Sequence, residues 1–183
     1  MNNAQGFAVP NEVFDRSLRS GFVSPNQATP LWGGMGVTPS MPPAGLPMSL
    51  GAMLSLATDL SSLRGLTTFS GSEAMIEDDP STVPLAAPGD GTNPGGAINW
   101  FALGSGAYLW LQCSPNTATA IRAAKSISQP LFWDYVNQVL LTTPASPGDL
   151  PIDGEVLQLN IQAQVVAPAG AGWISGCAAL IEI

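Results

Sequence analysis

The stretch from Val156 to Val166, which reads VLQLNIQAQVV, carries the clearest strand signal in the sequence. Apolar residues alternate there with uncharged amides, so that one set comprises Leu157, Leu159, Ile161, Ala163 and Val165 and the other Gln158, Asn160, Gln162 and Gln164. Successive side chains of a β-strand point to opposite faces of a sheet, and this pattern therefore predicts one apolar face and one amide face. The amide face fits an ordinary exposed surface, which we favour, or a polar contact between subunits.

Other segments also carry strand signals. Residues 98–101 and 106–113 are rich in aromatic and branched residues, and the second segment has apolar side chains on both faces, as a central strand would. Residues 172–183 end in the apolar run AALIEI, which predicts a terminal strand held in the sheet. Residues 50–66 fit both a helical stripe and an alternating strand. Short strands separated by glycine and proline turns predict an all-β fold, an antiparallel β-sandwich or barrel.

The N-terminal part of the chain has a different composition. Its first 48 residues contain seven prolines and no long periodic segment. Because proline restricts φ and donates no backbone hydrogen bond, we expect a long, Pro-rich extended N-terminal arm over residues 1–48, followed by a β-domain over residues 49–183. A short helix is predicted near residues 11–20, with Asn11 as its cap, Gly21 at its end and acid–base pairs at Glu12/Arg16 and Asp15/Arg19.

Two apolar groups in this arm are candidate partner-binding residues. Val13, Phe14 and Leu18 would share one side of the short helix, which needs to dock on its own domain or on a neighbouring subunit to be stable. The second group is Leu31, Trp32 and Met35, in the segment TPLWGGM at residues 29–35, where glycines frame an apolar cluster. Such a cluster either packs locally or inserts into a pocket of a partner.

The sequence lacks the side chains on which most catalytic sites depend. It contains no histidine, and so it has no group whose ordinary pKa lies near neutrality and no imidazole metal ligand. The clustered acids Glu77, Asp78 and Asp79 are the main candidates for acid–base catalysis, and we expect their side chains to point into solvent. The segment GDGTN at residues 89–93 lacks the full ligand pattern of a calcium loop and is predicted to be a turn. We therefore expect no enzyme activity, no metal and no cofactor.

Charge and hydropathy limit the possible partners. Five basic residues stand against thirteen acids, which gives a net charge of −8. Nucleic-acid binding is not expected, because Lys and Arg supply most of the affinity for a phosphate backbone. No apolar run reaches the length of a membrane span, and the N-terminus lacks the regions of a signal peptide, so neither a membrane nor export is expected.

The two cysteines, Cys113 and Cys177, both lie in apolar segments. Two cysteines without histidine cannot enclose a zinc ion. Buried free thiols are the favoured interpretation, and a disulfide is the alternative.

Residues 50 to 183 contain five patterns that read LGAMLSLAT (50–58), LRGLTTF (63–69), GSGAYLWL (104–111), FWD with QVL (132–134 and 138–140) and ALIEI (179–183). With these patterns the chain resembles the structural cement, or decoration, proteins of tailed-phage capsids. The resemblance implies short strands before and after a Trp133–Asp134 turn, a terminal apolar strand, and β-structure over residues 50–66. The Pro-rich start departs from the family pattern.

The resemblance also implies a function. It indicates a non-enzymatic virion protein that binds the outside of the phage head and bridges subunits of the major capsid protein. Such a protein would be made in the host cytoplasm and would form a homo-oligomer, a dimer or trimer at a symmetry axis, with residues 1–48 reaching the capsid or a neighbour. The alternative is a virion-surface or fibre-type recognition module whose aromatic and amide-rich face binds host carbohydrate.

Overall fold

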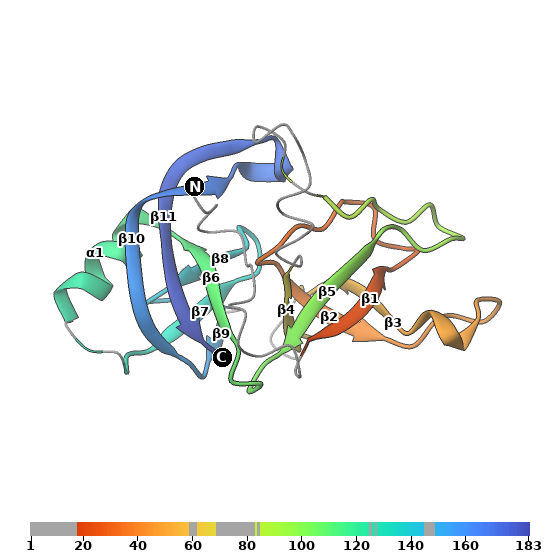
Figure 1. The fold of residues 1–183 in the computed structure, drawn as a ribbon, viewed down its shortest axis with the longest axis horizontal. Coiled ribbons are helices and arrows are strands. Elements are labelled where there is room, and N and C mark those ends of the chain that lie inside the picture. The colour runs from red at the N-terminus through yellow and green to blue at the C-terminus, as the bar shows by residue number, and fades with distance from the viewer. Residues whose placement is uncertain are drawn as a thin grey trace.

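The computed structural model describes residues 18–58, 62–68, 83, 85–124, 126, 128–144 and 149–183. The expected all-β class is confirmed, because the described strands form two sheets that lie side by side (Figure 1). The first is a closed barrel in the order β1-β3-β2-β4-β5, with strands at Arg19–Val23 (β1), Gly36–Ser40 (β2), Ala52–Leu56 (β3), Gly65–Thr68 (β4) and Ala97–Ala102 (β5).

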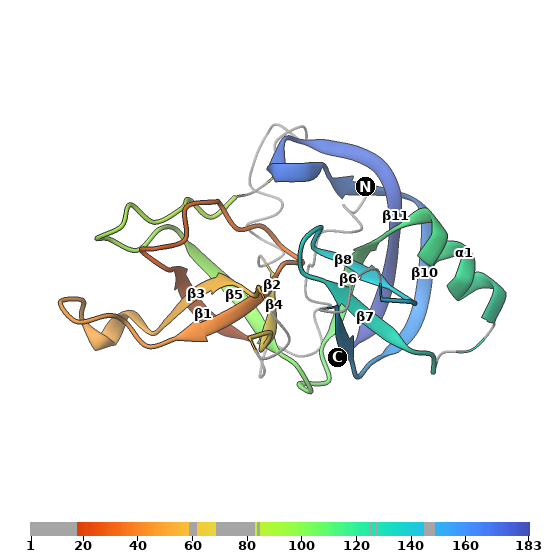
Figure 2. The ribbon, with the colours of Figure 1, turned by 180° about the vertical axis from the view of Figure 1, so that it is seen from behind.

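The second sheet has six strands in the order β10-β11-β6-β8-β7-β9. Its strands are Tyr108–Cys113 (β6), Leu131–Asp134 (β7), Val139–Leu141 (β8), Leu150–Ile152 (β9), Glu155–Val166 (β10) and Trp173–Glu182 (β11). Strands β10 and β11 form a long curved hairpin, and the helix α1 (Pro115–Ala124) lies beside β10 in both views (Figures 1 and 2). Two short 3₁₀ turns are η2 (Met48–Leu50) and η3 (Pro168–Gly170).

The sheets are not purely antiparallel. Strand β1 pairs with β3 in parallel, and β6 pairs with β8 in parallel, while the remaining pairs are antiparallel. A parallel pair needs a crossover connection, and β1 reaches β3 only after the chain has passed through β2. Local patterns in the sequence do not report such connections.

The expected extended arm over residues 1–48 is not what residues 18–48 form. Strand β1 pairs with β3 and β5, and β2 pairs with β3 and β4, so these residues belong to the barrel and the boundary after residue 48 is wrong. The prolines are compatible with this. Pro39 lies beyond Val37, the last β2 residue that pairs with β4, and its missing N–H does not interrupt that ladder.

The predicted helix near residues 11–20 lies mostly outside the described residues. Its last positions, Arg19 and Ser20, are in β1, where they pair with Trp100 and Asn99 of β5. The ambiguous stretch from 50 to 66 contributes η2, strand β3 and the start of β4, as the β interpretation predicted. Pairing with strands far away in the sequence therefore decides the secondary structure of both segments.

Strand β10 departs from the simple alternation predicted for it. Its pairing with β11 slips between Val156 and Gln158, and again between Asn160 and Ala163, so each slip inserts one extra residue. Each insertion reverses which side chains face which side of the sheet. The predicted apolar face is consequently divided: Leu159 packs against the main core, Ala163 and Val165 pack with Ala178 and Trp110 on the opposite face, and Leu157 and Ile161 are exposed.

The main hydrophobic core is shared by both sheets. It joins barrel residues such as Leu66 and Phe101 to Leu111 and Trp133 of the second sheet. A second cluster fills the barrel and includes Val166 from the end of β10, so the long hairpin also contacts the barrel. The described strands therefore form one structural unit and not an arm attached to a domain.

Candidate interaction surfaces

The structure places the apolar cluster of residues 29–35 inside the protein. Leu31 and Met35 are fully buried, and Trp32 is half-buried against the barrel core. Leu31 forms a backbone bridge with Ala86, and the Thr67 hydroxyl donates a hydrogen bond to the Trp32 carbonyl oxygen at 2.5 Å. Local packing, the first of the two interpretations, is confirmed for Leu31 and Met35, and these two side chains are not surface anchors for a partner.

The structure describes only part of the first candidate partner-binding group, the apolar side of the predicted short helix. Leu18 is half-buried and packs against the shared core, whereas Val13 and Phe14 lie outside the described residues. The sequence alone does not distinguish an apolar residue that packs on its own domain from one that packs on another chain. For Leu18 the structure shows contact with its own domain.

An extended uncharged surface lies on the β10–β11 hairpin. Between Glu155 and Glu182 the chain contains no charged residue. Two of the apolar side chains there are well exposed, Leu157 at 38% and Ile161 at 51%, and Ile174 of β11 is exposed as well. The neighbouring amides Gln158, Gln162 and Gln164 are also exposed. These six exposed side chains lie on both faces of the hairpin, because Gln164 pairs opposite Ser175 and Ile174 pairs opposite Val165, and we call the set the hairpin surface.

The two bulges explain why these apolar side chains reach solvent. Leu157 is the extra residue of the first bulge, and Ile161 lies in the second. The second bulge is held locally, because the Gln162 backbone N–H donates to Asn160 Oδ1 at 2.9 Å. Strand β10 is also an edge of its sheet, and bulges on an edge strand discourage continuous pairing with another strand. Contact at this edge would therefore use side chains more than a backbone ladder.

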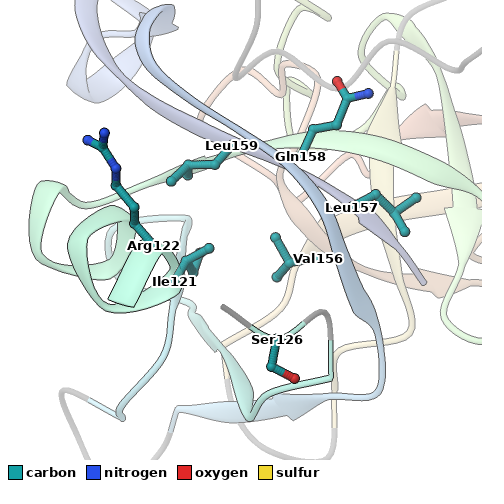
Figure 3. Close-up of a pocket in the computed structure, with 7 residues that line it drawn as sticks. All are labelled: Ile121, Arg122, Ser126, Val156, Leu157, Gln158 and Leu159. Atoms are coloured by element: carbon teal, nitrogen blue, oxygen red, sulfur yellow. The ribbon is translucent and has the colours of Figure 1, made fainter. Parts of the chain in front are cut away.

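A shallow groove of about 260 Å³ lies between α1 and the first half of β10 (Figure 3). The Ser114 side chain accepts the Thr117 backbone N–H at 3.1 Å and caps the helix, whose buried side then carries Ala118 and Ile121 onto the core. In Figure 3 Ile121 and Val156 face each other across the groove and Arg122 stands at its rim. The lining residues are Ile121, Arg122, Ser126, Val156, Leu157, Gln158 and Leu159.

Two of the described carboxylates, Asp90 and Asp134, stabilise local turns. Asp90 accepts hydrogen bonds from the Asn93 side-chain amide at 2.8 Å and from the backbone N–H groups of Asn93 and Thr92 at 2.6 and 2.8 Å, and these bonds hold the pKa of Asp90 far below its usual value. Residues 89–93 thus form the predicted turn. Asp134 makes the same set of bonds to Val136 and Asn137 in the turn between β7 and β8. The acids Glu77, Asp78 and Asp79 lie outside the described residues.

Cys113 and Cys177 are paired in register on β6 and β11, and both are buried free thiols, as the favoured interpretation predicted. Burial and the neighbouring Cys177 raise the pKa of Cys113 to about 12. In the part of the chain that the structure describes, no three His, Cys, Asp or Glu side chains are grouped so as to hold a metal ion. No helix in that part combines the length and apolar character needed to cross a bilayer.

No family model, curated protein or solved structure matches this chain. The resemblance to phage cement proteins therefore rests on the sequence patterns from residue 50 to 183.

Proposed function

We propose that this protein is a structural cement protein of a tailed-phage virion. It binds the outside of the head as a homo-oligomer and bridges subunits of the major capsid protein, without catalytic activity. The observation that carries the proposal is the hairpin surface, an exposed set of apolar and amide side chains in a stretch with no charge between Glu155 and Glu182.

The hairpin surface suits contact between copies of the chain. Each copy has a net charge of −8, and so two copies repel each other electrostatically. The hairpin is a place where they can approach without bringing carboxylates together. Burying Leu157, Ile161 and Ile174 contributes roughly 25 cal/mol per Å² of apolar area, and the amides can donate and accept hydrogen bonds across the contact.

The α1–β10 groove continues this surface. Leu157 and Gln158 belong to both, and the apolar floor of Ile121 and Val156 lies beside them. At a two-fold axis the same patch serves both copies, so a modest contact area on each copy is doubled, whereas around a three-fold axis the patch meets a different surface of the next copy and this contact is repeated three times. A cement protein stabilises a capsid because the same modest contact is repeated by symmetry at every copy on the head.

The proposal is tested by counting this chain in purified virions by quantitative mass spectrometry. Hundreds of copies per virion are expected for a protein that covers the head. A dozen copies or fewer would place the chain in a fibre or tail, and absence from the virion would refute the proposal. Binding of the isolated protein to a glycan array, with few copies in the virion, would favour the carbohydrate-recognition alternative.

A further inference from the structure

The loop between β2 and β3, residues Met41 to Gly51, extends from the end of the barrel that lies away from the second sheet (Figures 1 and 2). Its sequence is MPPAGLPMSLG. Met41 is 69% exposed and Met48 is 60% exposed, so two large apolar side chains of one loop lie in solvent. We call this segment the methionine loop.

The surroundings of the methionine loop carry no charge in the sequence. No Asp, Glu, Lys or Arg stands between Arg19 and Asp59. A solvated loop of ordinary composition contains charged or strongly polar residues, whereas this one exposes methionine, proline and alanine. The composition therefore indicates that a binding partner covers this surface when the protein performs its function.

The loop is held in shape by its own backbone. Three prolines restrict φ, and two turns are closed by hydrogen bonds from Leu46 N–H to the Pro43 carbonyl and from Leu50 N–H to the Pro47 carbonyl, both at 3.1 Å. Gly45 has a φ of 101°, a value that favours glycine. Because the backbone is already ordered, little conformational entropy remains to be lost when the loop binds.

We propose that the methionine loop is a plug that inserts Met41 and Met48 into an apolar pocket of a protein partner. This inference rests on the proposed function, under which the partner is the major capsid protein. Methionine suits the role because its unbranched, polarisable side chain adapts to the shape of a pocket.

Charge argues for a protein pocket and against a lipid surface. The loop has no Lys or Arg to meet anionic headgroups, and it has no Trp or Tyr, the residues that favour the membrane interface. The net charge of −8 adds repulsion from an anionic bilayer. An apolar pocket in a protein requires none of these groups.

The test measures binding of the full chain to purified heads that lack it, by co-sedimentation over a range of protein concentrations. Three variants are compared with the wild type: M41S/M48S, the conservative M41L/M48L, and V136S. Val136 is 72% exposed in the turn between β7 and β8, and so V136S is a matched control for loss of an exposed apolar side chain elsewhere. Thermal unfolding of each variant checks that the fold is retained.

The expected result is a roughly 100-fold weaker affinity of M41S/M48S, because two apolar side chains no longer enter the pocket. M41L/M48L and V136S should bind within about threefold of the wild type. The wild-type affinity should also change little between roughly 50 and 500 mM NaCl, since the contact carries no charge.

The other outcomes separate the two proposals. Heads that bind M41S/M48S as tightly as the wild type would overturn the plug and leave the cement function standing. Heads that do not bind the wild type would overturn the cement function and, with it, the capsid as the partner of the loop. Methionine-dependent binding to phosphatidylcholine–phosphatidylglycerol vesicles would instead show a lipid partner and overturn the protein pocket.

Discussion

The backbone N–H of Gly36 donates a hydrogen bond to Oε1 of Gln138 at 2.7 Å, and this bond joins the barrel to the second sheet. Gln138 lies in the turn after β7, and its own amide donates to the Tyr135 carbonyl at 2.6 Å. The side chain is buried and its backbone has a φ of 56°. One residue in an unusual conformation thus fixes a contact between strand β2 and the β7–β8 turn, which are about a hundred positions apart in the sequence.

Replacing Gln138 by alanine should destabilise the protein by about 1–3 kcal/mol, because the buried Gly36 N–H loses its acceptor. Chemical denaturation of the variant and the wild type measures this change. Gln129→Ala is the matched control, since the Gln129 side chain donates a local hydrogen bond to the Ser126 carbonyl at 3.1 Å and its loss should have a small effect. Equal stability of Gln138→Ala and the wild type would show that the bond between the sheets is dispensable.

Replacing Gly36 by alanine should also destabilise the fold, for a steric reason. A Cβ at this position would lie 2.6 Å from Trp133 Nε1 and 2.7 Å from Leu63 Cδ1, and both side chains belong to the shared core. We expect a loss of about 1–3 kcal/mol and a lower melting temperature. Ala44→Ser, on the exposed methionine loop, controls for the effect of adding one heavy atom elsewhere. A variant as stable as the wild type would mean that the two sheets can separate slightly without penalty.

Self-association through the hairpin surface can be tested with charge. The double variant L157D/I161D places two carboxylates in a stretch that has none, and it should weaken association of the copies by at least roughly 100-fold. Sedimentation velocity over a range of protein concentrations measures the change. Val136→Asp adds a charge at another exposed apolar position and should leave association intact. A wild type that remains monomeric at every concentration would contradict the assignment of the hairpin surface.

Stability should fall as the pH rises above about 9. The pKa of Cys113 increases from 9.0 to about 12 on folding, so between these values the unfolded chain loses its thiol proton while the folded chain keeps it. Ionisation then favours the unfolded state, by about 1 kcal/mol at one pH unit above the lower value. Denaturation curves at pH 7 to 10 should show this decline, and Cys113→Ala should show a smaller one. An identical pH dependence in the variant would assign the decline to other groups, such as Tyr108, whose pKa is raised by the charge of Glu182.

Thiol labelling gives an independent measure of the same site. Both cysteines should react slowly with a thiol reagent at pH 8 in the native protein and rapidly after denaturation, because both are buried and the Cys113 thiolate is scarce. Rapid labelling under native conditions would show that strand β11 opens from β6. Since the two residues are register partners, loss of both thiols on isolation would indicate a cross-strand disulfide.

The candidate surfaces could be predicted only in part. The amide and apolar character of Val156 to Val166 is plain in the sequence, but the exposure of Leu157 and Ile161 depends on two bulges that no local pattern marks. The cluster around Trp32 was a candidate anchor, and the structure instead buries Leu31 and Met35 beneath strands from distant parts of the chain. The methionine loop was missed, although its signal was present, because residues 41–51 contain two methionines and three prolines and lie within a long run without charge.

The sequence by itself determined the strand-rich class, the positions of many strands and the low-charge character of the surface, because side-chain alternation, turn residues and net charge are local or additive properties. Tertiary structure alone decided that residues 18–48 form part of a barrel, that β1 and β6 have parallel neighbours, and which apolar side chains remain exposed. These features depend on pairing between segments far apart in the chain. The free energy of such pairing comes from the shared core and from register, and neither can be read from one segment at a time.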